Sequence, residues 1–166
     1  MSAEPRVASH APLLVKEGEQ YLSTGINLNH NMLSGNLETF PELVNLLLVD
    51  PNMLQSLDLS FNMFNEVPAS IIQFTSLKYL YLHKNLLNDI GEVKKLVQLK
   101  ELKYLTLHGN PIEVAVPYLR SYVLYLLPSL RSLNCTPVTK ADLKTSNTWG
   151  KMNRTIFKTV KKPTNN

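Results

Sequence analysis

Four stretches of the chain share one spacing pattern, and the pattern brings four asparagines into phase. The stretches are "STGINLNHNML" (23–33), "LQSLDLSFNMF" (54–64), "LKYLYLHKNLL" (77–87) and "LKYLTLHGNPI" (102–112). Each follows L-x-x-L-x-L-x-x-N-x-L, and only Ser23 fails at the marked positions when Ile and Phe are accepted for Leu. Self-similarity at a spacing of this size indicates a stack of repeated units.

The pattern has a direct physical reading. Each x-L-x-L-x stretch predicts a short strand whose leucines point inward and whose x residues point outward. One such unit cannot bury its apolar side alone, so stacked units form a parallel sheet over a continuous core. The asparagine amides are expected to bond backbone groups of neighbouring turns, which burial would otherwise leave without partners. This predicted asparagine ladder comprises Asn31, Asn62, Asn85 and Asn110.

The segments between the strands predict helices on the convex side. "NLETFPELVNLLLVDPNM" has acidic residues early, an apolar face and a terminating Asp-Pro, which predicts a helix over about 39–49. "ASIIQFTS" and "IGEVKKLVQLKE" predict shorter helical or 3₁₀ segments. The alternation favours an α/β solenoid with strands on the concave face.

A solenoid exposes its core at both ends, so capping segments are expected. "VPYLRSYVLYLLPSLRSLNCTPVT" (116–139) predicts a C-terminal cap, with a helix followed by a degenerate fifth strand. In that strand Cys135 falls in a leucine position, which predicts a buried thiol. "TKADLKTSNTWGKM" predicts a last helix that packs on the cap through Leu143, Trp149 and Met152. The expected division is 1–20 as an N-terminal extension, 21–139 as repeats and cap, 140–152 as the flanking helix and 153–166 as a basic tail.

The positive charge of the chain is concentrated at its C-terminal end. The net charge is +4, yet residues 143–166 hold six basic side chains and no acidic one. One interpretation is a tail that is simply solvated. The other is a segment that binds an acidic polymer, such as the microtubule surface or a nucleic acid. No apolar run is long enough to cross a bilayer, and the N-terminus lacks the apolar segment of a secretory signal. The candidate tail contacts are Lys151, Arg154, Lys158, Lys161 and Lys162.

On these motifs the chain is similar to leucine-rich repeat proteins of the short class shared with dynein light chain and phosphatase regulators. The segments "INLNHNML", "LTLHGNPIE", "YVLYLLPSL" and "VTKADLKTSNTWGKMN" resemble the leucine-rich repeat-containing protein 51 family. In mammals that family lies beside, and reads through into, a transmembrane O-methyltransferase. The resemblance implies a cytoplasmic interaction protein of ciliated cells and the microtubule-based axoneme, without enzymatic activity or cofactor. The first repeat departs from the consensus at Ser23, and Gly25 leaves its outward side thin.

The repeat geometry also predicts which side chains face the concave surface. Aromatic residues gather in the third and fourth repeats, on strands expected roughly 5 Å apart. Tyrosine offers a large contact area with a polar tip, which is typical of interface hot spots. Cross-strand packing that merely stabilises the sheet is the alternative. The candidate partner-binding residues are Asp58, Tyr79, Tyr81, His83, Tyr104, Thr106 and His108, and the outward positions of the cap strand add Ser132, Asn134 and Thr136.

The sequence disfavours both metal binding and nucleophilic catalysis at these positions. His83 and His108 share one position in consecutive repeats, but the neighbouring repeats offer only Ser60 and Thr136 as further ligands, so no metal site is expected. A nucleophilic pair is disfavoured because Cys135 is expected inside the core and the histidines outside it. The sequence therefore predicts a protein-binding scaffold, as a structural or adaptor component of the ciliary axoneme with axonemal or tubulin-containing partners. The alternative is an adaptor subunit of a nuclear ribonucleoprotein or signalling complex; neither a small-molecule substrate nor a membrane is expected.

Overall fold

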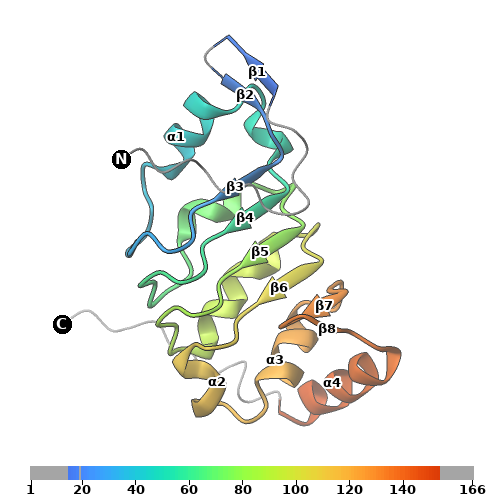
Figure 1. Cartoon of the computed structure of the whole chain (residues 1–166). Coiled ribbons are helices and arrows are strands. Elements are labelled where there is room, and N and C mark those ends of the chain that lie inside the picture. Colours follow the sequence, from blue (N-terminus) through green and yellow to red (C-terminus); the bar gives the residue numbers. More distant parts are fainter. Residues whose placement is uncertain (1–14, 19, 154–166) are drawn as a thin grey trace, which may run out of the picture.

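The computed structural model describes residues 15–18 and 20–153, which form a curved stack of short strands backed by helical segments (Figure 1). Six strands form one sheet in the order β3-β4-β5-β6-β7-β8. The first five are parallel and aligned residue by residue, so that Ile26, Leu57, Leu80, Leu105 and Leu133 share one row. The predicted α/β solenoid is confirmed. The strands are β3 Gly25–Asn27, β4 Ser56–Asp58, β5 Tyr79–Tyr81, β6 Tyr104–Thr106, β7 Ser132–Leu133 and β8 Thr136–Pro137.

Helical segments cover the convex side of the sheet. Helix α1 (Phe40–Leu47) occupies the predicted span of 39–49, and it ends where Leu48 takes up extended backbone. The two shorter predicted segments are 3₁₀ helices, Ala69–Gln73 and Ile90–Gln98. A further 3₁₀ turn, Pro51–Met53, and helix α2, Pro111–Ala115, complete this layer.

The core is a column of consensus leucines between these layers. Leu57, Leu80 and Leu105 from the strands are at most 1% exposed, and Phe64 and Ile71 from the connections are fully buried. Burying a side chain of this size contributes about 1.5–3 kcal/mol relative to exposure. The repeat pattern therefore specifies the fold mainly through apolar burial.

The buried asparagines link consecutive repeats, as the repeat pattern predicts. The Asn85 amide donates to the carbonyls of Leu59 and Leu82, and its Oδ1 accepts the Phe64 N–H. Asn62 and Asn110 make the corresponding bonds one repeat away on either side.

Asn31 differs from the other three asparagines because it follows β3, the end strand of the six-stranded sheet in the described residues. Its side chain is exposed and donates only to the Asn29 carbonyl, while its backbone N–H bonds Asn62 Oδ1. Asn31 therefore marks the open end of the ladder.

The C-terminal cap departs from the prediction at Cys135. The chain reverses at Asn134 and Cys135, whose φ values of 52° and 61° are left-handed, and β8 returns antiparallel to β7. Cys135 is exposed at this turn, so its predicted burial is wrong. Asn134 and Thr136 likewise do not extend the parallel strand. Instead, Asn134 Oδ1 accepts the N–H groups of Leu107 and His108 and ends the ladder.

Two helices close the C-terminal end of the stack. Helix α3 (Leu119–Leu126) lies in the cap and packs against α4 (Lys140–Met152), with Trp149 partly buried against the core. The Trp149 ring stacks on Tyr118 at 5.0 Å. Met152 is 80% exposed, so its predicted packing on the cap is wrong. It sits in the last turn of α4.

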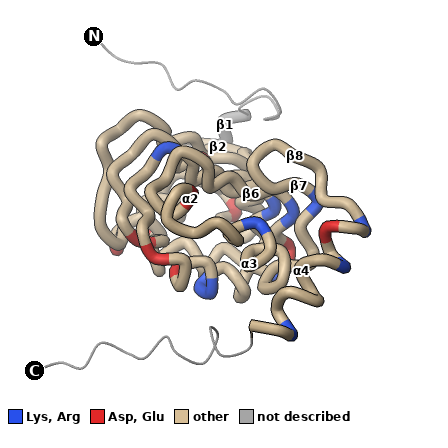
Figure 2. Tube along the Cα trace, turned by 90° about the horizontal axis from the view of Figure 1, so that it is seen from below, with Lys and Arg blue, Asp and Glu red and all other residues tan. Residues whose placement is uncertain are grey.

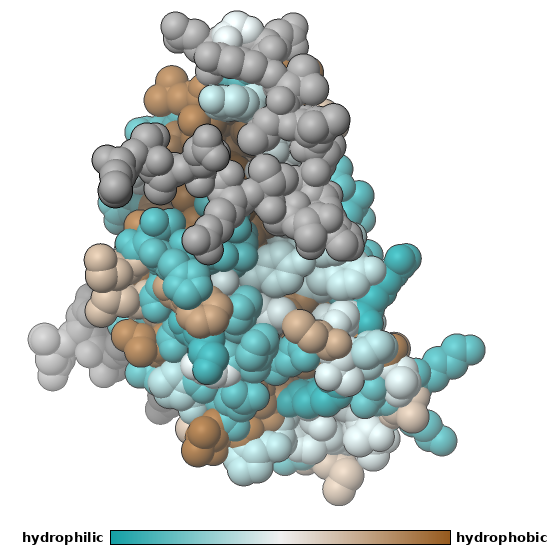
Figure 3. Space-filling view, viewed as in Figure 1, coloured by the Kyte–Doolittle hydropathy of each residue, from teal (hydrophilic) through white to brown (hydrophobic). Residues whose placement is uncertain are grey.

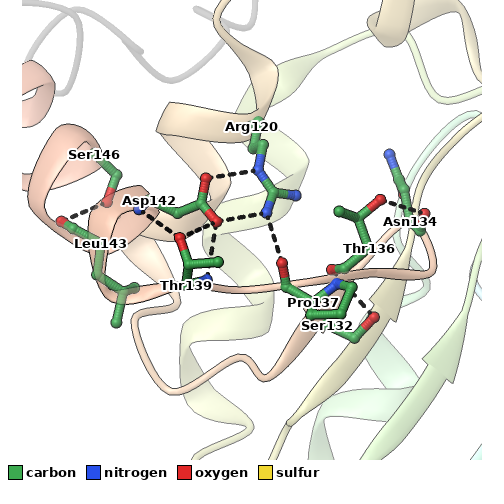
Figure 4. A network of polar contacts seen from close by, with 9 residues as sticks. All are labelled: Arg120, Ser132, Asn134, Thr136, Pro137, Thr139, Asp142, Leu143 and Ser146. Atoms are coloured by element: carbon green, nitrogen blue, oxygen red, sulfur yellow. Dashed lines mark hydrogen bonds and ion pairs between the residues drawn. The ribbon is translucent and has the colours of Figure 1, made fainter.

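An ion pair anchors the start of α4 to α3 (Figure 4). Arg120 Nη2 lies 3.0 Å from Asp142 Oδ2 and also donates to the Pro137 carbonyl. Asp142 and Thr139 form a capping box, because the Thr139 hydroxyl accepts the Asp142 N–H and Asp142 accepts the Thr139 N–H. The hydrogen bonds from Arg120 and Thr139 hold the pKa of Asp142 well below its ordinary value of 3.8.

The stability contributed by the Asp142 network is expected to depend on pH. A depressed carboxyl pKa stabilises the folded state above the unfolded-state value and loses this contribution as the pH falls through the folded-state value. The midpoint temperature of thermal unfolding is measured from pH 6 down to about pH 2. As the pH falls, this temperature should decrease more steeply in the parent chain than in D142N. Parallel profiles would contradict the assignment.

The N-terminal end carries a small antiparallel pair, β1 (Val15–Glu17) with β2 (Gln20–Leu22). Tyr21 bridges to Leu48 beside α1, which ties this pair to the first repeat. Of the predicted tail contacts only Lys151 lies within the described residues; Arg154, Lys158, Lys161 and Lys162 lie outside them. Among the described helices, none is long and apolar enough to cross a membrane.

Candidate functional site

A stacked tyrosine pair lies at the centre of the concave face. Tyr79 and Tyr104 begin adjacent parallel strands in register, and their rings stack at 4.5 Å with an angle of 8°. The same register position carries Ser56 on β4 and Ser132 on β7. The two rings therefore form a raised aromatic block with a small residue on either side.

Tyr81 lies one row further along the strands, between Asp58 and Thr106. Burial, and then the charge of Asp58, raise the pKa of the Tyr81 hydroxyl, so it stays protonated and able to donate at neutral pH. The Asp58 carboxylate is already engaged within the fold. Its Oδ1 accepts the hydroxyl and the N–H of Ser60, and its Oδ2 accepts from Asn29.

Two stacked histidines follow in the next row. The rings of His83 and His108 lie 4.7 Å apart at 9°, and His83 Nδ1 lies 2.9 Å from the Thr106 hydroxyl. Burial, and then the neighbouring His108, lower the pKa of His83, which favours its neutral form at pH 7. Nδ1 of His108 is buried and has no hydrogen-bond partner within the described part of the chain.

Thr106 differs from its predicted role as a contact residue. The structure places it in the concave row, but it is only 4% exposed. Its hydroxyl bonds His83 Nδ1, so it positions the imidazole and is covered from solvent. The predicted residues that remain partly exposed on this face are Asp58, Tyr79, Tyr81, His83, Tyr104 and His108.

The structure extends the histidines into a longer aromatic row that the repeat pattern did not predict. Phe61 meets His83 edge to face at 5.3 Å, and His30 stacks on Phe61 at 4.1 Å. His30 and Phe61 each directly precede a consensus asparagine. Both have left-handed backbone, with φ of 58° at His30 and 53° at Phe61. A glycine in that position of the fourth repeat, Gly109 with φ 70°, is the sequence signal that could have indicated this backbone.

Apolar side chains line the rim where the chain leaves the strands. Met32, Met63 and Leu86 each follow a consensus asparagine, and they are 80%, 50% and 47% exposed. In Figure 3 tan and brown side chains lie along the left edge of the strand face, beside a mostly teal centre. The aromatic row is thus bordered by apolar surface.

A hollow of about 320 Å³ lies between α2, α3 and the cap hairpin. Its polar lining is committed to the fold: Glu113 accepts the Gly109 N–H, Arg120 pairs with Asp142, and Asn134 accepts from the Leu107 backbone. No group of three or more His, Cys, Asp or Glu side chains in the described residues is placed to hold a metal ion. The geometry therefore favours the concave face as the site that meets a partner.

Comparisons of structure show that other proteins share this fold. A chain in the crystal structure of the Drosophila melanogaster SNF/U2A′ complex aligns with a TM-score of 0.66 at 22% identity, covering 83% of this chain and 75% of that one. The Mex67 LRR domain from Chaetomium thermophilum aligns with a TM-score of 0.61 at 21% identity, covering 74% and 88%. At these identities the likeness concerns the fold.

Comparisons of sequence identify the family as well as the fold. A leucine rich repeat family model matches residues 51–112. Leucine-rich repeat-containing protein 51 of Rattus norvegicus is 40% identical over 153 residues, which cover 92% of this chain and 78% of the relative. The Homo sapiens protein of the same name is 38% identical with the same coverage. The chain belongs to the leucine-rich repeat-containing protein 51 family.

Proposed function

We propose that this chain is a non-enzymatic scaffold whose concave face binds a protein partner, and that it serves as a structural or adaptor component of the ciliary axoneme. The observation that carries the binding proposal is the aromatic surface formed by Tyr79, Tyr81, Tyr104, His83 and His108. This surface stands on a rigid sheet and is held by stacking before a partner arrives.

The energetics favour such a surface as a binding site. Association costs free energy because side chains are immobilised, and a preorganised surface lowers that cost. The Tyr79–Tyr104 and His83–His108 stacks already fix four rings, and tyrosine adds a hydroxyl that can bond a partner's backbone. The exposed rim at Met63 and Leu86 adds adaptable apolar contact.

The axonemal part of the proposal rests on the family resemblance, which implies ciliated cells and microtubule-based assemblies. The proposed partners are accordingly axonemal or tubulin-containing proteins, with the basic residues of the tail, Lys151 among them, as secondary contacts. A nuclear ribonucleoprotein adaptor is the competing function, and RNA co-purification would indicate it.

The test of the binding proposal is affinity capture from demembranated axonemes with the double variant Y79S/Y104S. Serine is chosen because Ser56 and Ser132 occupy the same register position in this sheet, so the fold accepts it. Loss of the two rings is expected to weaken capture of the specific partner about tenfold, as for moderate hot-spot residues. Mass spectrometry identifies the captured proteins, and titration of the purified partner measures the change.

The matched control is Y118A. Tyr118 is 36% exposed and also stacks on a neighbouring ring, but it lies beside α3 and Trp149. Y118A is expected to capture the same proteins as the parent chain. Equal capture by Y79S/Y104S and the parent, with both folded by circular dichroism, would contradict the proposal.

A further inference from the structure

A column of basic residues lies where the chain enters the strands, one position before the row of the tyrosine pair. Lys78, Lys103 and Arg131 each stand one residue before a strand, directly ahead of Tyr79, Tyr104 and Ser132. Backbone bonds run from Lys103 to Lys78 and from Arg131 to Lys103, which sets the three residues in register. Adjacent parallel strands lie about 4.8 Å apart, so the backbone positions of the three basic residues fall within about 10 Å. Figure 2 shows basic positions gathered beside β6 and β7.

These three cations have no acidic partner among the described residues. The ion pairs found there involve Lys95 and Arg120. Lys78 bonds the neutral side chain of Gln55, the residue at the same position one strand earlier. Like charges at strand spacing repel one another, and no ion pair within the described residues neutralises these three.

The acidic group of the concave face, Asp58, lies on β4, the strand next to β5. Asn29 and Ser60 bond its carboxylate. The charges are therefore ordered along the sheet, with the carboxylate on β4 and the cations immediately before β5, β6 and β7. A partner that crosses the face must match this order of charge.

We propose that the concave face binds an acidic segment of a protein partner, whose carboxylates lie over Lys78, Lys103 and Arg131 and whose apolar side chains cover the Tyr79–Tyr104 pair. This inference rests on the proposed function and adds the chemistry of the partner. Complementary charge of this kind sets orientation and partner choice more than raw affinity.

Two features favour a protein over a nucleic acid. Nucleic-acid sites commonly neutralise about 6–10 phosphates, whereas this column offers three cations with the Asp58 carboxylate further along the same face. Base recognition on single strands uses open aromatic faces, whereas Tyr79 and Tyr104 occupy each other's inner faces at 4.5 Å.

The test uses the full chain and a defined probe, a short fluorescein-labelled peptide of alternating glutamate and leucine. Its glutamine–leucine counterpart and a labelled poly(U) oligonucleotide are measured beside it by fluorescence anisotropy. The variant is K78Q/K103Q. The matched control is K140Q/K144Q, which removes the same charge from two exposed lysines of α4.

The glutamate peptide is expected to bind the parent and K140Q/K144Q alike, and K78Q/K103Q about fivefold more weakly, as for two exposed ion pairs. Added salt should weaken the binding, and the glutamine peptide should bind less well. An equal loss in both double variants, no loss in K78Q/K103Q, or no binding of the glutamate peptide by the parent would overturn the inference. Tighter binding of poly(U) that depends on Lys78 and Lys103 would overturn it in favour of nucleic acid.

The capture experiment with Y79S/Y104S separates this inference from the proposed function. If the tyrosine variant loses the captured partner while K78Q/K103Q keeps it, the scaffold function stands and the acidic-segment inference falls. If both variants keep the partner, the concave face is not the binding site and both proposals fall.

Discussion

Replacing Asn85 with alanine should lower the free energy of unfolding by about 2–4 kcal/mol, because one buried backbone N–H left without a partner costs about 1–3 kcal/mol and each further lost hydrogen bond about 1 kcal/mol. The variant strands the N–H of Phe64 inside the stack. It also removes one of the two amide donors from the Leu59 and Leu82 carbonyls, which keep their bonds from Asn62 and Asn110. Urea denaturation of the parent and the variant, followed by circular dichroism, measures the difference. Against a typical domain stability of about 5–15 kcal/mol, this loss is large.

Asn31 provides the matched control, because it occupies the same consensus position in the first repeat. Its side chain is exposed and donates only to the Asn29 carbonyl. N31A is therefore expected to change the unfolding free energy by less than about 0.5 kcal/mol, as exposed substitutions usually do. If N31A and N85A destabilise the chain equally, burial of the ladder does not explain why the asparagine recurs.

The fold could be predicted because its main determinant is periodic. Leucines at fixed positions define both the strand register and the inward side, and Leu57, Leu80 and Leu105 occupy one buried row as that logic requires. Helix α1 followed from its own apolar face and its terminating Asp-Pro. Each of these inferences depends on local pattern and on burial.

The failures occur where the repeat ends and its logic no longer applies. Cys135 fits the leucine position in spacing, but Asn134 and Cys135 take left-handed backbone and reverse the chain. A spacing pattern carries no information on φ, so the hairpin could not be read from it. Met152 is exposed for a comparable reason, since apolar character alone does not show where contact between two helices stops.

The sequence predicts which residues of the candidate site share a row of the sheet. It does not predict how exposed each side chain is. The stacking of Tyr79 on Tyr104 follows from parallel register. The burial of Thr106 depends on the larger rings around it, which only the three-dimensional packing reveals. Phe61 joins the face through its left-handed backbone.

The basic column was visible in the sequence as a cation at the second position of "LKYL", "LKYL" and "LRSL". Its meaning depends on two facts that only the structure supplies. The three residues are in register before adjacent strands, and none of them is in an ion pair within the described residues. A surface charge thus indicates a binding site only when the groups around it are known.

Replacing Gly150 with alanine should destabilise the chain by about 1–3 kcal/mol, the usual cost of overpacking. Gly150 is buried in α4, and a Cβ atom there would lie 2.2 Å from Cδ2 of Tyr125 on α3. Thermal and urea unfolding measure the loss. The direction is informative, since glycine to alanine in a solvated helix interior stabilises by up to about 1 kcal/mol.

Two further variants separate close packing from helix propensity. N147A changes an exposed position of the same helix and should be neutral or slightly stabilising, because alanine is the better helix former. Y125A removes the ring that Cβ would meet, so G150A should cost much less in the Y125A background than in the parent. An equal cost of G150A in both backgrounds would show that the Tyr125 ring is not the obstacle.

With the ring as the obstacle, glycine at position 150 is required by the close approach of α3 and α4, which also buries Ser146 one turn earlier. The helix that closes the solenoid thus gives up intrinsic helix propensity to gain contact with the cap.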